Sequence, residues 1–251
     1  MKYLHWDEKI ISDFQASNIT DMYEKGYVFT RIDKGVMQQT RSLRVDLAKF
    51  ELSSENRRIL RKFPDLKIRD EFFDYAPSTS SGQDQNKLHP PKEYDFSIGK
   101  LAKDFYEIKF GKGIMSAQKI KEMITDGSKS NFNLLLQFQG GDVFYSERSR
   151  RTHPGKAYSI CYQNSSILHY SYPFYDLDKC QKDMGMAMMI NAILFAKNSK
   201  LKYIYLGSLQ RSSDVYKLQF AGLEWFDGKN WSTDMDEAKN ILARGDGGIN
   251  N

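Results

Sequence analysis

A strand–helix–strand succession in the C-terminal half constrains the fold more than any other feature of the sequence. Residues 167–174 read as a strand, residues 183–198 as a long helix that is apolar on nearly every side, and residues 201–207 as a short buried strand. Two strands joined through a helix form a βαβ crossover, which is normally right-handed with nearly parallel strands. The sequence therefore predicts an α/β (α+β) fold that contains one βαβ unit.

Antiparallel pairing is expected elsewhere, because short β-prone runs alternate with turn signals. The predicted strand pairs are 27–32 with 41–45, 133–138 with 142–147, and 157–162 with 167–174. Capping residues and stop signals predict further helices at residues 18–26, 53–62, 116–127 and 233–244. The sheets should therefore be mixed but mostly antiparallel.

A polar segment rich in Ser, Gln, Asn, Asp, Gly and Pro interrupts this pattern after residue 75, and it has almost nothing apolar to bury. We expect an N-terminal half at residues 1–75, a mobile linker or loop at 76–98 and a C-terminal half at 99–251. The 251 residues are enough for one large α/β domain or two small ones.

Several protein classes are not supported by the composition. The longest apolar runs are far shorter than the roughly 20 residues that span a bilayer, and no apolar stretch at the start resembles a secretion signal, so we expect a cytoplasmic protein that binds no membrane. The two cysteines, Cys161 and Cys180, and four scattered histidines lack ligand spacing, and no Ser-His-Asp arrangement stands out. We expect no metal and no cofactor.

Positive charge is concentrated in two stretches, residues 41–69 and 148–156. The net charge is +5 and the pI about 8.9, which favours an anionic partner. These basic side chains would contact RNA phosphates, or they would only keep the protein solvated. The candidate RNA-binding residues are Arg57, Arg58, Arg61, Lys62, Arg148, Arg150, Arg151 and Lys182.

The bend before the long helix reads Lys182-Asp183-Met184-Gly185-Met186-Ala187. It is close to the Arg/Gln-x-x-Gly-x-Gly/Ala pattern of GNAT acetyltransferases, with lysine as a departure at the first position. Small residues let a phosphate approach the backbone, and the N–H groups and dipole of a helix N-terminus attract it. Close packing against a sheet explains the same small residues, and the methionines of this helix suit a buried core.

Two separated blocks together resemble the bacterial branch of the arginyl/leucyl-tRNA-protein transferases. The first block contains Arg44-Val45-Asp46-Leu47-Ala48-Lys49-Phe50, Ser54 and Arg57-Arg58-Ile59-Leu60-Arg61-Lys62. The second contains Pro173-Phe174-Tyr175-Asp176, the helix that begins at Met184, Tyr203-Ile204-Tyr205-Leu206-Gly207, Tyr216-Lys217-x-x-Phe220 and Leu223-Glu224. The match covers about half of the chain. Met37 and Thr40 stand where that family has cysteines, and Ser208, Ser213 and Asp214 are further departures.

The resemblance implies a tandem GNAT-like fold in which the 3′ end of an aminoacyl-tRNA occupies the βαβ cleft. The amino acid, Leu or Arg, would pass to the N-terminal amine of a protein or peptide that begins with an acidic residue. An α-amine with a pKa near 7.7–8.0 is partly deprotonated at neutral pH, so holding amine and ester in line would supply most of the acceleration.

Site residues follow from the same resemblance. We expect catalytic roles for Asp176, Tyr205 and Lys217. Substrate-binding roles are expected for Arg41, Arg44, Tyr175, Gly185, Ala187, Gly207, Ser208 and Tyr216, with the two arginines attracting the acidic acceptor residue. Each tyrosine has an alternative reading as a core residue whose hydroxyl reaches the surface.

Two other functions remain open from the sequence. A GNAT enzyme that acetylates an amine from acetyl-coenzyme A explains the helix bend but not the first basic block. A non-catalytic adaptor of the same fold would bind RNA or a degradation partner and transfer nothing, which the departures at Ser208 and Ser213-Asp214 would allow.

Overall fold

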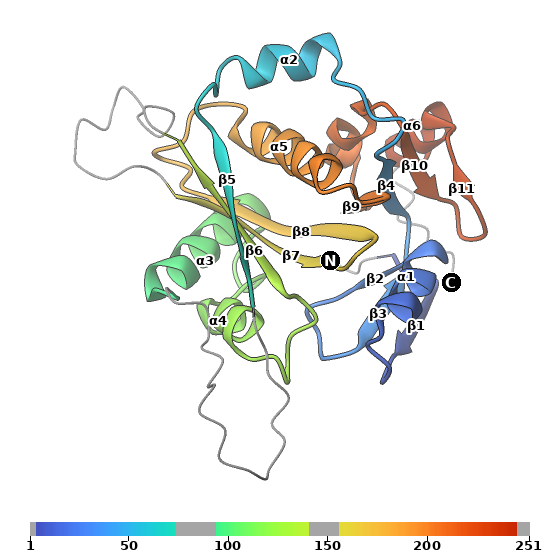
Figure 1. Cartoon of the computed structure of the whole chain (residues 1–251), viewed down its shortest axis with the longest axis horizontal. Helices are drawn as coiled ribbons and strands as arrows, with labels where there is room; N and C mark the ends of the chain where they lie inside the picture. The colour runs from blue at the N-terminus through green and yellow to red at the C-terminus, as the bar shows by residue number, and fades with distance from the viewer. Residues whose placement is uncertain (1–3, 74–93, 141–155, 245–251) are drawn as a thin grey trace.

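A computed structural model describes residues 4–73, 94–140 and 156–244 (Figure 1). The strands are β1 (Asp7–Ile10), β2 (Tyr27–Phe29), β3 (Val36–Gln39), β4 (Ser42–Asp46), β5 (Lys67–Phe72), β6 (Leu134–Gln139), β7 (Ala157–Gln163), β8 (Ile167–Tyr175), β9 (Tyr203–Ser208), β10 (Leu223–Phe226) and β11 (Trp231–Ser232). The helices are α1 (Ala16–Glu24), α2 (Ser54–Leu60), α3 (Phe96–Phe110), α4 (Ala117–Thr125), α5 (Met184–Asn198), the 3₁₀ helix η2 (Ser212–Gln219) and α6 (Met235–Ala243).

The strands form two sheets. The large sheet has the order β11-β10-β4-β9-β8-β7-β6-β5, and every neighbouring pair in it is antiparallel except β8 and β9, which are parallel. The small sheet has the order β1-β3-β2 and is antiparallel. The predicted mixed α/β fold with mostly antiparallel sheets and one βαβ unit, β8-α5-β9, is confirmed.

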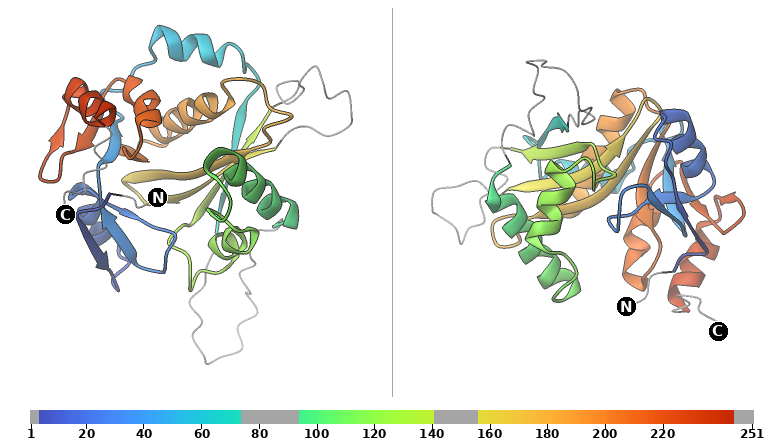
Figure 2. Two further views of the ribbon diagram at one scale, coloured as in Figure 1. Left: turned by 180° about the vertical axis from the view of Figure 1, so that it is seen from behind. Right: turned by 90° about the horizontal axis from the view of Figure 1, so that it is seen from below.

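Two hydrophobic cores lie on opposite faces of the large sheet, and alternation along β6 shows the division. Leu134 and Leu136 join the core under α5, whereas Leu135 packs with α3 and α4. Figures 1 and 2 show α5 on one side of the strands and α3 with α4 on the other. Met184, Met188 and Met189 are buried in the α5 core, so these methionines fill the interior.

The helices predicted from periodicity and capping are confirmed as α1, α2, α4, α5 and α6. α2 begins with a capping box, in which the Ser53 hydroxyl accepts from the Asn56 N–H and the Asn56 side chain accepts from the Ser53 N–H. The predicted pair of 157–162 with 167–174 is confirmed as β7 and β8. Residues 133–138 form the strand β6, but β6 pairs with β5 on one side and with β7 on the other, and its expected partner 142–147 lies outside the described residues.

One predicted strand pair is wrong. Residues 27–32 were expected to pair with 41–45, but β2 pairs with β3 around the turn at Gly35, and β4 lies in the large sheet between β9 and β10. β4 is only two residues beyond β3, so local signals do not separate them. Residues 74–93, which include most of the expected linker, lie outside the described residues. The helix α3 begins at Phe96, inside the range 76–98 that was expected to be a linker. The division into two halves stays a prediction.

Gly26 follows α1 in a backbone conformation that favours glycine. Its φ is +80°, and an added Cβ would overlap the Phe226 ring. We expect Gly26→Ala to lower the free energy of unfolding by about 3 kcal/mol, since backbone strain and overpacking add. Gly113 has the same φ with open space around it, so Gly113→Ala should cost only about 1 kcal/mol. Urea titrations that gave equal losses would contradict the packing role of Phe226.

Candidate functional site

The parallel strands of the βαβ unit separate after a short paired stretch. β8 and β9 are paired only at Ile167–Tyr203, Leu168–Ile204 and His169–Tyr205. Beyond these positions β8 stays with β7 as far as Tyr175, while β9 stays with β4 as far as Ser208. α5 follows β8 in the chain, so its N-terminus lies at the end where the two strands have diverged (Figure 1).

The N-terminus of α5 is built around a strained residue and a glycine. Asp183 precedes the helix with a φ of 75° and makes no side-chain cap. A Cβ on Gly185 would sit 3.4 Å from the Tyr175 ring, and the Gly185 N–H donates toward the Tyr175 hydroxyl. Burial raises the pKa of Tyr175, so this hydroxyl stays protonated. Ala187, in contrast, is fully buried in the core.

Basic side chains of α2 and of the turn that follows it lie beside this helix terminus. The Lys62 Nζ is 2.5 Å from the Asp183 carboxylate, and the Gln181 amide donates to the Lys62 carbonyl at 2.8 Å. Hydrogen bonding to Lys62 lowers the pKa of Asp183. We use the name α2 basic surface for the exposed residues Arg57, Arg58, Arg61, Lys62 and Lys182. The structure therefore brings the basic residues at 57–62 beside Lys182, which lies about 120 positions later in the sequence.

Not every member of this surface is equally available to a ligand. Arg58 makes a two-pronged contact with Glu55 one turn earlier, with its Nη2 2.6 Å from Oε1 and its Nε 2.7 Å from Oε2. Arg148, Arg150 and Arg151 lie outside the described residues. Lys156, the first described residue after them, accepts at its carbonyl from the Asp176 N–H at the end of β8.

The end of β9 and the helix η2 lie across from the end of β8, beyond the point where the two strands diverge, and Gln219 of η2 contacts Met186 of α5. The Lys217 ammonium is 3.1 Å from the Asp214 carboxylate and donates to the Ser208 carbonyl at 3.1 Å. Tyr216 is 45% exposed, and Gly207 has a φ of 79° with open space beside it. Four residues predicted from the sequence, Gly207, Ser208, Tyr216 and Lys217, are thus brought together here.

Asp176 lies at the end of β8, as predicted, but its carboxylate is already used. One oxygen accepts from the Asp178 and Lys179 N–H groups, both at 3.1 Å, and Lys179 Nζ is 3.6 Å from the other. These bonds fix the turn that leads from β8 toward α5. The geometry suits a positioning role for Asp176.

Arg44 and Tyr205 lie on the other face of the sheet from α5. The Arg44 guanidinium sits 4.0 Å from the Tyr203 ring centre and 3.9 Å from that of Trp231, and its Nε is 2.7 Å from Glu224. Tyr205 is fully buried, and burial raises the pKa of its hydroxyl well above the ordinary value. The structure does not bring these two side chains to the α5 terminus. Arg41, next to β4, adjoins β9 through the bond from the Leu209 N–H to its carbonyl.

Tyr170 is a residue of this region that sequence reasoning missed. It directly follows the last β8–β9 pair and faces the core under α5. Its buried hydroxyl has no hydrogen-bond partner among the described residues, and burial, with Cys161, Tyr216, Tyr106 and Tyr175 nearby, raises its pKa. The sequence signal for this position is the alternation of side chains along a strand: Tyr170 is two residues after Leu168 and therefore lies on the same face of β8, toward α5.

Both cysteine side chains are at least partly buried. Burial raises the pKa of Cys161 and of Cys180 to about 12, so both thiols are protonated at neutral pH. No group of three or more His, Cys, Asp and Glu side chains within residues 4–73, 94–140 and 156–244 is placed to hold a metal. None of the helices in these ranges is long and apolar enough to cross a bilayer.

Acid sensitivity is expected from His169, whose ring is buried against Tyr23 with its Nδ1 2.9 Å from the Tyr23 hydroxyl. Burial lowers the pKa of His169 to about 3. Below about pH 6.5 the His169 side chain is protonated in the unfolded chain but stays neutral in the native state. The free energy of unfolding should therefore fall as the pH drops from 6.5 toward 3, by up to about 1.4 kcal/mol per pH unit. NMR titration checks this prediction, which a His169 ring titrating near pH 6.5 would contradict.

Comparisons with known proteins give a distant structural likeness only. No family model matches the chain, and no curated protein matches its sequence. One similar solved structure is the C-terminal domain of a putative lysylphosphatidylglycerol synthetase from Agrobacterium fabrum, with 11% identity and a TM-score of 0.40 over 94% of this chain and 58% of that one. Another is L-PGS from Bacillus licheniformis, with 11% identity and a TM-score of 0.39 over 90% and 70%. The chain thus spans less than two thirds of the first of these structures, and likenesses of this size assign no activity.

Proposed function

We propose that this protein transfers an aminoacyl group from a charged tRNA to an amine. The proposed acceptor is the α-amine of a protein or peptide that begins with an acidic residue. The observation that supports it is the position of the α2 basic surface beside the N-terminus of α5, at the open end of the βαβ unit. The resemblance of the two sequence blocks to aminoacyl-tRNA-protein transferases supplies the reaction class.

The two sides of the opening would have different tasks. Arg57, Arg61 and Lys182 would contact phosphates of the acceptor arm, which positions the RNA without reading its sequence. The Tyr175 side chain packs against Gly185 and accepts from its N–H, so a terminal ribose or phosphate would meet the α5 terminus beside this tyrosine. Lys217, held by Asp214 and the Ser208 carbonyl, would meet the aminoacyl group from the other side.

The chemistry needs little acid or base power. An α-amine is partly unprotonated at neutral pH and an aminoacyl ester is an activated donor, so alignment is the main contribution of the protein. Arg44 is buried and does not reach the α5 terminus, so attraction of an acidic first residue would fall to Arg41, whose side chain is partly exposed next to β4. Asp176 would have a positioning role, because it holds the turn that leads toward α5. Tyr205 would position β9 through its packing in the core.

A transfer assay tests the proposal directly. The protein is incubated with radiolabelled mixed aminoacyl-tRNAs and with peptides that begin with Asp, Glu, Arg or Ala. Label is expected on the Asp and Glu peptides and should disappear when the tRNA is deacylated beforehand. Absence of label from every peptide would contradict the transferase proposal. Acetylation of the same peptides from acetyl-coenzyme A would instead favour the acetyltransferase alternative, and RNA binding without transfer would favour an adaptor.

Lys217→Met is expected to lower kcat/KM for transfer by roughly 10- to 100-fold, because a misplaced aminoacyl group loses alignment with the amine. Lys239→Met is a matched control, since Lys239 also pairs with an aspartate three residues earlier, Asp236 at 2.8 Å, but on the exposed face of α6. Steady-state rates with one peptide and one aminoacyl-tRNA check this difference. Equal rates for the two variants would remove Lys217 from the site.

A further inference from the structure

Tyr170 keeps an unused hydrogen-bond donor inside the region where β8 and β9 diverge. Its side chain is 2% exposed, and its hydroxyl has no hydrogen-bond partner among the described residues. A buried hydroxyl in this state has lost its bonds to water without gaining others, which opposes folding. Such groups are few in native proteins, and catalysis is one of the reasons for which they are kept. A ligand that offered an acceptor would supply the missing bond.

The surroundings of this hydroxyl lie at the N-terminus of α5. Tyr106 of α3, Tyr175 of β8 and Tyr216 of η2 are close enough to the Tyr170 hydroxyl to act on its pKa. Tyr175 in turn accepts from the Gly185 N–H in the first turn of α5, and its ring packs on that glycine. The unpartnered hydroxyl and the N-terminus of α5 therefore belong to one opening, which three elements besides the helix enclose.

The exposure of the neighbouring tyrosines shows the side from which a ligand would come. Tyr106 is buried and fixed, because its hydroxyl donates to the Pro173 carbonyl at 3.2 Å. Tyr216 is 45% exposed, and it stands on the short 3₁₀ helix η2. The ring of Tyr216 is thus the neighbour that can turn outward into solvent. A ligand would reach the Tyr170 hydroxyl from the side of η2.

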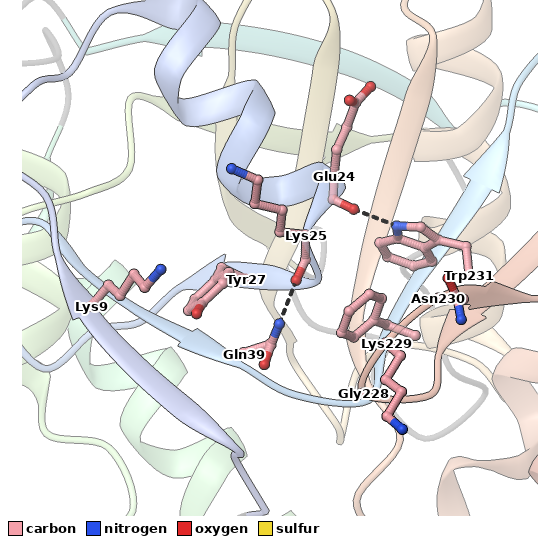
Figure 3. A pocket seen from close by; sticks show the side chains of 10 residues that line it. Lys9, Glu24, Lys25, Tyr27, Gln39, Gly228, Lys229, Asn230 and Trp231 are labelled. Carbon is pink, nitrogen blue, oxygen red and sulfur yellow. Dashed lines mark hydrogen bonds between the residues drawn. The ribbon is translucent and has the colours of Figure 1, made fainter.

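A hollow of about 420 Å³ elsewhere in the molecule is less suited to a charged RNA end (Figure 3). It lies where the small sheet meets the β10–β11 hairpin, and none of its lining residues belongs to β8, α5 or η2. The ammonium groups of Lys9 and Lys229 point to separate sides of it. The ring of Trp231 is covered by Arg44, whose guanidinium carbon is 3.9 Å from the ring centre.

We propose that Tyr170 is a catalytic residue of the transfer reaction, whose hydroxyl donates a hydrogen bond to the carbonyl oxygen of the aminoacyl ester. This inference rests on the proposed function. In the reaction, the acceptor nitrogen bonds to the ester carbon, the bond from that carbon to the ribose oxygen breaks, and one amine proton passes through water to the released ribose oxygen. The carbonyl oxygen gains negative charge on the way, so the bond from Tyr170 strengthens in the transition state.

Two properties of Tyr170 suit this role. Burial raises the pKa of its hydroxyl, so the group keeps its proton at neutral pH and acts as a donor rather than as a base. The hydroxyl also has no bond to give up among the described residues, so it is available when the ester arrives. Donors that are in place before charge develops are the ones that contribute most to catalysis of acyl transfer.

Tyr170→Phe tests the inference, because it removes the hydroxyl and keeps the ring. For transfer from charged tRNA to a peptide that begins with Asp, kcat should fall about 100-fold, while KM should rise at most about 5-fold. Tyr94→Phe is the matched control. Its buried hydroxyl also has no partner, but Tyr94 packs with α3 and α4 on the other face of the large sheet. Both kinetic constants of this control should be unchanged.

Two measurements without turnover accompany the kinetics. Isothermal titration calorimetry uses 3′-amide analogues of leucyl- and arginyl-adenosine, which are stable mimics of the charged tRNA end. An analogue that binds the unchanged protein should bind Tyr170→Phe about 5-fold more weakly and Tyr94→Phe equally well. The urea midpoint of Tyr170→Phe should equal or exceed that of the unchanged protein, since the variant loses a hydroxyl that had no partner.

The outcomes separate this inference from the proposed function. Transfer by the unchanged protein with an equal kcat in Tyr170→Phe would overturn the role of Tyr170 and leave the proposed function intact. A lower urea midpoint in Tyr170→Phe would also overturn it, because the hydroxyl would then have a structural partner. Absence of transfer, with analogue binding that depends on Tyr170, would refute the proposed function and support the contact. Absence of both transfer and analogue binding at millimolar concentration would overturn the two together.

Discussion

Replacing Arg57, Arg61 and Lys182 together with glutamine is expected to weaken binding of aminoacyl-tRNA about 100-fold at 0.15 M salt. The estimate follows from counterion release, in which each phosphate contact adds about 0.9 to the slope of log K against log salt. Three lost contacts then lower the slope by about 2.7 and the affinity by about two decades at this ionic strength. Fluorescence anisotropy with labelled tRNA over a series of salt concentrations measures both quantities.

The control for this experiment must carry the same change in net charge. Lys109, Lys112 and Lys121 are exposed on and near α3 and α4, on the opposite side of the large sheet from α2. Their replacement by glutamine should leave the slope nearly unchanged. If both triple variants lost affinity equally, the tRNA would be responding to overall charge, and the α2 basic surface would have no special part in binding.

Glu224→Ala is expected to lower the free energy of unfolding by about 3 kcal/mol. The carboxylate and the Arg44 guanidinium are both at least 88% buried as side chains, with Arg44 Nε 2.7 Å from Glu224 Oε2. Removing one partner of a buried ion pair leaves an uncompensated charge, which typically costs 3–5 kcal/mol. The lower figure is expected because the Tyr203 and Trp231 rings still cover the cation. Urea denaturation followed by fluorescence gives the value.

Asp236→Ala is the comparison for this variant. Asp236 also pairs with a basic side chain, Lys239 at 2.8 Å, but both side chains are more than half exposed. Exposed pairs contribute little, so this change should leave the free energy of unfolding nearly unchanged. A loss below about 1 kcal/mol for Glu224→Ala would mean that the rings and Tyr205 hold Arg44 without an acidic partner.

Local patterns in the sequence identified most of the framework around the proposed site. The apolar run that becomes α5, the capping residues of α2 and the alternation of β7 and β8 each lie within a short window, so periodicity and capping are sufficient to predict them. The basic spacing on α2 likewise predicted an exposed charged face. The βαβ rule then placed β8 and β9 in parallel, as observed.

Relations across long sequence distances were not predictable in the same way. Arg44 alternates with apolar neighbours and was predicted to bind substrate, but its partner Glu224 is 180 positions away. The neighbours of β4 depend on the strand order of the whole sheet. That order decides whether the Arg44 side chain faces solvent or packs on Trp231. Tyr205 was also predicted to lie in the site, but its side chain packs in the core on the face of the large sheet away from α5.

The position of β4 also bears on how the chain is made. Val45 pairs with Leu223, and Ser42 with Ser208, so a strand synthesised early waits for partners that are synthesised last. Contacts between such distant positions slow folding, and unpaired strand edges invite aggregation in the meantime. A nascent chain that stops before residue 203 would carry β4 with neither neighbour. Such truncated products should therefore be insoluble or quickly degraded, and refolding after denaturation should be slow.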